Sequence, residues 1–185
     1  MKRSTWIVLV IFLALAGIFF YLNQRESTVS EDGEASPTVA PVEYLISETD
    51  GLPSSIEIKS NSGDQVHIER DEAGEWVLKQ PIEAEANQGS AEAAASQLTA
   101  LRIVSRPEVA PADAGLIHPS YEMTVKLTGG TVKHVRIGDL TPTESGYYTS
   151  VDDSDEVLIV SKTGLDSLLV LLTSPPYAST PTPEP

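Results

Sequence analysis

The middle of the chain is dominated by short runs in which apolar and polar residues alternate. Such alternation places the apolar side chains of a strand on one face and the polar side chains on the other. Three runs, 56–59, 66–69 and 76–78, are separated by turn sequences rich in Asn, Asp, Ser and Gly. They predict an antiparallel meander that ends at Pro81, and residues 42–47 are a candidate for a further strand.

After this meander the spacing of apolar residues changes from strand-like to helical. Asn87 is suited to cap a helix, because its side-chain oxygen can accept the free N–H groups of the first turn. The apolar stripe that follows is Ala91, Ala94, Ala95, Leu98 and Leu101. Pro107 sets the limit beyond which this helix cannot continue.

The second half of the chain repeats the same order of patterns. Its alternating runs are 121–127, 132–137, 147–151 and 157–160. Gly129-Gly130 provides a tight turn between the first two runs. A second helical pattern then extends from about Thr163 to Leu172, with Ser161 as a candidate cap.

These patterns predict an α+β fold in which antiparallel β-meanders pack against two helices. Segments 56–68 and 123–135 align without a gap, and both have Lys at the fourth position and His at the twelfth. A duplicated β-β-β-α unit would explain this likeness, although any two hairpins with one polar face look alike. The predicted core contains Trp76, Leu78, Leu98, Leu101, Val125, Val135, Ile137, Leu165 and Leu168.

The N-terminus carries an uncharged apolar run, residues 6–22, at the short end of what spans a bilayer. Lys2 and Arg3 precede this run, which predicts a cytoplasmic N-terminus and an extracytoplasmic C-terminal domain on a single-pass protein of the cell membrane. The alternative is a signal peptide cleaved after Ala16, because Ala14-Leu15-Ala16 has the small-x-small form of a cleavage site. An uncleaved anchor is favoured, because cleavage there would leave only a short apolar stretch before the cut to serve as the hydrophobic region of a signal peptide.

Composition divides the chain into four parts. Residues 1–22 are the predicted transmembrane anchor, and residues 23–42, rich in Ser, Glu and Pro, are a flexible linker. Residues 43–174 are the folded domain. Residues 175–185 form a Pro- and Thr-rich tail that is predicted to be disordered.

The net charge of the chain is −15, and beyond Arg25 nine Lys and Arg residues stand against all 27 Asp and Glu residues. So acidic a domain repels nucleic acid and anionic lipid headgroups. A protein partner should therefore present a neutral or basic surface, and binding should weaken as salt rises. The chain has no Cys, which excludes disulfides and thiolate metal sites.

No residue is assigned as catalytic, cofactor-binding or metal-ligating, no cofactor is expected, and the contacts with a ligand or partner stay unassigned. His67, His118 and His134 lie far apart in the sequence and form no ligand motif, although His67 and His134 should both point to the polar face of the sheet. The acidic run 152–155 could hold calcium, but it lacks the ligand spacing of an EF-hand loop and fits a solvated turn better.

The serines and the aromatic residues are candidates for two other kinds of site. None of the serines lies in a nucleophile motif such as Gly-x-Ser-x-Gly or Ser-x-x-Lys. Trp76 and Tyr147-Tyr148 could line a ligand pocket, but aromatic residues in such strands more often pack in the core.

Several short motifs occur in a characteristic order. They are Trp76, Pro81, Asn87, Gly115-Leu116-Ile117-His118-Pro119, Ile137-Gly138, Pro142 and Tyr147-Tyr148. In this order and spacing, from about Ile56 to Leu172, the chain resembles the bacterial domain of unknown function (DUF) 4340 family. It departs from the family pattern at Ala114, where an aromatic residue is frequent, and at Asn87, where Asp is commoner.

The resemblance implies a membrane-tethered extracytoplasmic domain whose relatives often accompany ABC-type transport systems. It implies no activity and no catalytic residues. We therefore expect a membrane-tethered envelope domain that is not an enzyme and that binds a protein partner, as an accessory to an ABC-type transport system. The alternatives are a solute- or glycan-binding envelope domain, which needs a concave pocket, and a hydrolase, which needs converging catalytic groups.

Overall fold

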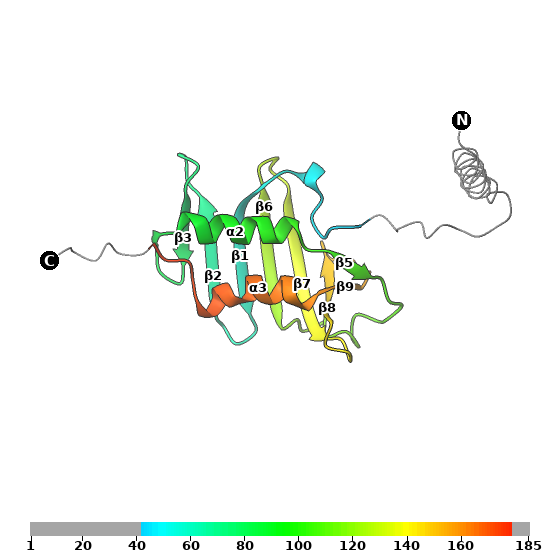
Figure 1. The fold of residues 1–185 in the computed structure, drawn as a ribbon. Helices are drawn as coiled ribbons and strands as arrows, with labels where there is room; N and C mark the ends of the chain where they lie inside the picture. The colour runs from blue at the N-terminus through cyan, green and yellow to red at the C-terminus, as the bar shows by residue number, and fades with distance from the viewer. Residues whose placement is uncertain (1–41, 179–185) are drawn as a thin grey trace, which may run out of the picture. The chain divides into compact units, whose positions relative to one another are not determined.

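The computed structural model describes residues 42–178. They form one nine-stranded sheet with the order β4-β3-β2-β1-β6-β7-β8-β9-β5, and every neighbouring pair of strands is antiparallel. Both helices lie across the same face of this sheet (Figure 1). The prediction of an α+β fold with antiparallel strands packed against two helices is confirmed.

The elements follow the predicted order, with two short strands added. The first half contains η1 (Glu48–Asp50), β1 (Pro53–Ser60), β2 (Gln65–Arg70), β3 (Trp76–Gln80), β4 (Ala84–Glu85) and α2 (Gln88–Thr99). The second half contains β5 (Ile103–Ser105), β6 (Tyr121–Leu127), β7 (Val132–Leu140), β8 (Gly146–Val151), β9 (Leu158–Ser161) and α3 (Lys162–Thr173). The additional strands β4 and β5 are too short to carry a period-two pattern.

The core lies between the sheet and the two helices. Every predicted core residue is at most 1% exposed: Trp76, Leu78, Leu98, Leu101, Val125, Val135, Ile137, Leu165 and Leu168. The small side chains of Ala91, Ala94 and Ala95 are also buried there, which lets α2 approach the sheet closely. The predicted core is therefore confirmed.

The two helix starts differ in how they are capped. Asn87 caps α2 as predicted, because its Oδ1 accepts the N–H of Ser90 at 2.9 Å. Ser161 occupies the N-cap position of α3, but its hydroxyl makes no capping hydrogen bond. Packing of Leu165, Leu168 and Leu171 against the sheet holds α3 in place instead.

The two aligned hairpins have the same strand register. Ile56 pairs with Ile68 in the first hairpin, as Met123 pairs with Val135 in the second. The innermost strands, β1 and β6, pair with each other so that Glu57 faces Thr124, its counterpart in the alignment. The two halves of the sheet therefore meet back to back around this pair, related by an approximate twofold axis.

The domain extends beyond its predicted limits at the C-terminal end. Tyr177 forms a bridge with Ala86, and the N–H of Ala178 donates to Glu85 O at 2.9 Å. The prediction that the disordered tail begins at residue 175 is thus wrong for residues 175–178. A proline-containing segment cannot enter the middle of a sheet, but it can pair at an edge.

At the N-terminal end, the candidate strand 42–47 is reduced to one bridge, between Tyr44 and Arg102. Leu45 and Ile46 turn into the core, where they are 8% and 1% exposed. The predicted anchor 6–22 and all of the linker except residue 42 lie outside the described residues. Within residues 42–178, neither helix is long and apolar enough to cross a membrane.

Candidate functional site

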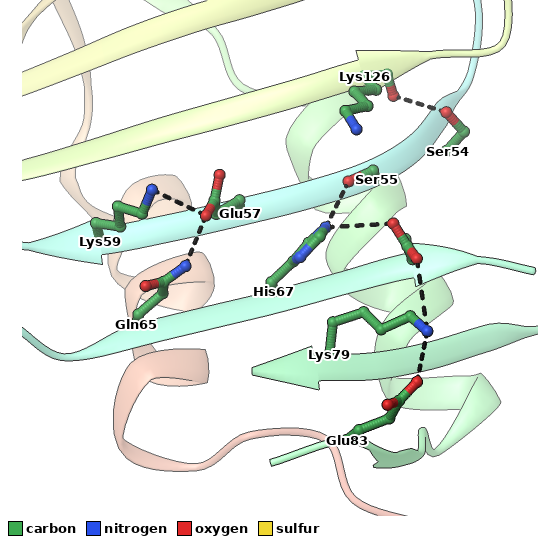
Figure 2. A network of polar contacts seen from close by, with 10 residues as sticks. Ser54, Ser55, Glu57, Lys59, Gln65, His67, Lys79, Glu83 and Lys126 are labelled. Atoms are coloured by element: carbon green, nitrogen blue, oxygen red, sulfur yellow. Dashed lines mark hydrogen bonds and ion pairs between the residues drawn. The ribbon is translucent and has the colours of Figure 1, made fainter. Parts of the chain in front are cut away.

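The face of the sheet opposite the helices is polar. Figure 2 shows its first-half side chains projecting away from α2 and α3, which lie behind the strands. We call this surface the open face, and it comprises Ser55, Glu57, Lys59, Gln65, His67, Glu69, Lys79, Glu122, Thr124, Lys126, His134 and Arg136. Strand alternation puts these residues together, because their neighbours Ile56, Ile58 and their equivalents face the core.

One polar chain crosses β1, β2 and β3 on the open face. His67 Nε2 lies 3.0 Å from Ser55 Oγ and 3.5 Å from a carboxylate oxygen of Glu69. Glu69 is 3.8 Å from Lys79 Nζ, which also donates to Glu83 at 2.6 Å (Figure 2). The bond to Glu83 raises the pKa of Lys79 and lowers that of Glu83.

A second chain lies beside it on β1 and β2. Glu57 Oε1 accepts from Lys59 Nζ at 2.9 Å and from Gln65 Nε2 at 2.6 Å (Figure 2). The cross-strand hydrogen bond from Gln65 fixes the long side chain of Glu57, which would otherwise move freely. In the second half, Arg136 Nε donates to Ser150 Oγ at 3.0 Å, and Thr124 Oγ1 lies 3.3 Å from His134 Nδ1.

The open face is nearly balanced in charge, in contrast to the acidic chain as a whole. Lys59, Lys79, Lys126 and Arg136 are four of the nine Lys and Arg residues beyond Arg25. They stand among three carboxylates of the strands: Glu57, Glu69 and Glu122. The acidic surplus of the chain therefore lies elsewhere.

Ser55, His67 and Glu69 contain the residue types of a hydrolytic triad, but not its geometry. Such a triad places the serine on one ring nitrogen of the histidine and the carboxylate on the other. Here both partners lie against the same nitrogen, Nε2, and Ser55 is only 4% exposed. The three side chains therefore link β1 to β2. Sequence reasoning missed this link, because only the register of β1 on β2 brings Ser55 to His67 and Glu69.

The three histidines do not come together. His67 and His134 lie on the open face, as predicted, at equivalent positions of the two hairpins. His118 lines a hollow of about 360 Å³ with Lys59, Ser60, Asn61, Pro119 and Glu122. Among residues 42–178, no three His, Asp or Glu side chains gather in a way that could hold a metal ion.

The acidic run 152–155 is used in building the turn after β8. Asp152 accepts the backbone N–H of His134 at 2.9 Å and a hydrogen bond from Lys133 Nζ at 3.1 Å. Both Asp152 and Asp153 have positive φ, which aspartate tolerates better than most residues. The turn interpretation of this run fits these contacts.

The aromatic residues singled out in the sequence are committed to packing. Trp76 is 1% exposed, its Nε1 donates to Glu92 at 2.8 Å, and the guanidinium of Arg70 lies 4.4 Å from its ring centroid. The Tyr147 hydroxyl donates to Asp166 at 2.8 Å. Burial, and to a smaller extent the Asp166 carboxylate, raises the pKa of Tyr147 to about 12. Tyr148 packs against a small cluster formed by Ala114, Leu116 and Val157.

Two of the motifs noted in the sequence meet in space. Gly115 has φ +70, and a Cβ on it would lie 2.7 Å from the Asp139 carboxyl. A Cβ on Gly138 would lie 2.1 Å from Ala114 O, and Asp139 N–H donates to that same oxygen at 3.0 Å. Gly115-Leu116 and Ile137-Gly138 thus allow the loop before β6 to lie directly on β7. This contact is structural, and it bounds the open face on one side.

Comparison with known proteins identifies a family. The domain of unknown function DUF4340 matches residues 76–173, which cover α2, α3 and every strand from β3 to β9. No curated protein and no solved structure matches the chain.

Proposed function

The chain belongs to the DUF4340 family, whose function is unknown, and we propose that its folded part is a non-enzymatic protein-interaction module that binds its partner through the open face. The observation that carries this proposal is the contrast between the two faces of one sheet. The helices pack on one face, and the other presents an ordered array of charged and polar side chains.

The order of this array favours recognition of another protein. Side chains that are already held by cross-strand contacts lose little conformational entropy on binding. Contacts between β1, β2 and β3 hold His67, Glu57 and Lys79 in this way. Net charge alone favours a neutral or basic partner surface. The local balance of the open face favours a partner of mixed charge, with carboxylates opposite Lys126 and Arg136.

We propose further that the anchor 6–22 and the linker 23–42 present the module on the extracytoplasmic side of the membrane, and that its partner is a protein of the envelope. Support comes from the charge asymmetry around the anchor. Tethering raises the effective concentration of two components in one membrane, so a weak interface suffices. The narrower hypothesis of an ABC-type transport partner rests on the family resemblance.

The common register of the two hairpins supports an ancient duplication of a β-β-β-α unit as the origin of the fold. The alternative function, a solute- or glycan-binding domain, is not favoured by any observation on residues 42–178. Its expected ligand contacts, Trp76 and Tyr147, are occupied by structural partners.

The test is a steric block at the centre of the open face. Thr124, between Glu57 and His134 in the strand register, is changed to arginine in the full chain. Cross-linking in membranes then compares captured proteins with those of wild type, at low and high salt. We expect Thr124→Arg to lose a partner that wild type captures, and capture by wild type to fall as salt rises.

A matched control is Ala93→Arg, which adds the same side chain at an exposed position of α2. This variant should capture the same proteins as wild type. Equal capture by both variants would show that the open face is not the interface. Turnover of a small substrate by the purified chain would overturn the non-enzymatic assignment.

A further inference from the structure

The two ends of the sheet are built in the same way. The strand after α2, β5, crosses to the second half and pairs with β9, where Ile103 faces Val160. The segment after α3 crosses to the first half and pairs next to β4, where Tyr177 faces Ala86. The same number of residues separates Ile103 from Tyr177 and Ala86 from Val160 in the sequence. The two ends are therefore equivalent positions of the approximate twofold arrangement.

The two ends differ in how firmly the crossing segment is held. β5 pairs with β9 at two positions and is covered on its outer side by residues 43–45, with Leu45 N–H donating to Leu101 O at 2.8 Å and Ile103 N–H to Glu43 O at 2.9 Å. At the β4 end, two backbone hydrogen bonds hold the crossing segment. They run from Asn87 N–H to Pro176 O at 2.8 Å and from Ala178 N–H to Glu85 O at 2.9 Å.

Pro176 is buried, but the two residues after it fit their surroundings loosely. Tyr177 is 42% exposed, and Ala178 borders a hollow of about 580 Å³ that is lined by Glu75 and Glu85 among others. Both carboxylates are exposed, and the turn residue Asp71 lines the same hollow. These three charges exceed the partial positive charge, about half a unit, at the start of α2. An alanine uses neither the volume nor the charge of this hollow.

We propose that the outer edge of β4 is a docking site for an extended segment of another protein, with a basic side chain that enters the hollow beside Glu75 and Glu85. The chain's own segment 176–178 occupies this edge until such a segment displaces it. Addition of a strand to a sheet edge is a general mode of peptide recognition, in which backbone hydrogen bonds give affinity and side-chain hollows give specificity.

The geometry of the edge supports exchange. Next to β4, the Gln88 side chain makes the two backbone hydrogen bonds that a neighbouring strand would make to Trp76. Its Oε1 accepts the Trp76 N–H at 2.8 Å, and its Nε2 donates to Trp76 O at 2.8 Å. β3 therefore stays satisfied when segment 176–178 leaves, and only Asn87 N–H and Glu85 O lose their partners. This site lies at the sheet edge and is independent of the open face.

The first experiment tests the side-chain preference within the full chain. Hydrogen exchange of the Asn87 amide reports how often segment 176–178 leaves the edge, because this amide donates to Pro176 O. At low salt, we expect Ala178→Lys to slow this exchange about two- to five-fold and Ala178→Glu to accelerate it, as for other partly exposed ion pairs. In a Glu75→Gln, Glu85→Gln background only Asp71 remains charged at the hollow, and the difference should shrink. Equal exchange rates for Ala178→Lys and Ala178→Glu would overturn the proposal.

The second experiment tests docking in trans. Ala178→Pro removes the N–H that donates to Glu85 O and frees the edge, while Ala178→Ser keeps that N–H and serves as the control. The probe is a labelled peptide of sequence Ser-Pro-Pro-Tyr-Lys-Ser-Thr-Pro, which is residues 174–181 with lysine at the position of Ala178. It should bind the Ala178→Pro chain several-fold more tightly than the Ala178→Ser chain, and more tightly than the same peptide with alanine. Binding that is equal for both chains, or equal for both peptides, would overturn the proposal. The Thr124→Arg block should leave peptide binding unchanged, so the two proposals can fail separately.

Discussion

On the helix-covered face of β1, Ile56 and Ile58 are at most 1% exposed, and they pack in the core. On the open face of the same strand, Glu57 pairs with Lys59 and accepts a hydrogen bond from Gln65. The strand thus contributes buried apolar area on one side, which drives folding, and fixed charges on the other. Substitutions on the two faces should therefore separate stability from partner binding.

The largest effect is expected for Leu98→Ala on the helix-covered face. Leu98 is fully buried, and its truncation removes apolar contacts and leaves a cavity, at a cost of about 2–5 kcal/mol in unfolding free energy. Urea unfolding of both proteins measures this. A change within about 0.5 kcal/mol, the range for surface sites, would contradict the packing of α2 on the sheet.

The contact between the two glycine motifs should be almost as sensitive. In Gly138→Ala the new methyl group would meet Ala114 O at 2.1 Å, so backbone must shift, and we expect a loss of about 1–3 kcal/mol. Thermal unfolding provides the measurement. Gly89→Ala is the control, because its Cβ would meet only Asn87 Oδ1 at 3.5 Å, and at the start of α2 this change should stabilise the fold by up to about 0.5 kcal/mol, less than in the middle of a helix. The opposite signs test the crossing of the loop over β7.

How far the sequence predicts the structure also differs between regions. Alternation and helical spacing are local signals, so they predicted the long strands, both helices and the nine core residues named from them. They also placed His67 and His134 on the polar face. The edge pairings of Tyr44 with Arg102 and of Tyr177 with Ala86 left no such signal. Each involves one or two residues whose partners are distant in the chain, and only the folded arrangement brings them together.

The same distinction applies to the candidate site. The alternation in β1 and β2 indicated that a polar face exists, but the contact of Ser55 with His67 depends on register, which single-strand patterns do not contain. The hollow beside Ala178 was missed for a different reason. Pro175-Pro176 indicated a segment outside the sheet centre, and that much is correct, but proline content does not distinguish a disordered tail from an edge strand.

A smaller effect, dependent on pH, is expected at the rim of the covered face. The hydrogen bond from Trp76, together with Arg70, lowers the pKa of Glu92. Its carboxylate therefore stabilises the fold above its unfolded pKa of about 4.3, and this contribution is lost as the pH falls through the lower folded-state value. Because Glu92 is largely exposed, Glu92→Gln should cost at most about 1 kcal/mol at pH 7, and less at pH 3.

Urea unfolding of Glu92→Gln and wild type at the two pH values measures this difference. Glu72→Gln, in the exposed turn between β2 and β3, controls for the loss of one negative charge. If Glu92→Gln and Glu72→Gln respond alike at both pH values, the bond between Trp76 and Glu92 does not contribute to stability.

The smallest change in stability is expected on the open face itself. The Lys126 side chain is exposed, and its ammonium has no ion-pair partner within residues 42–178. Lys126→Ala should therefore alter the unfolding free energy by no more than about 0.5 kcal/mol. If the open face binds a partner with carboxylates opposite Lys126, the same variant should capture less of it, and the deficit should shrink as salt rises. Arg102→Ala removes an exposed positive charge at the end of the sheet, away from the open face, and should leave capture unchanged. A stable Lys126→Ala chain with normal capture would remove this lysine from the interface, and a destabilised one would show that the open face contributes to folding more than its exposure implies.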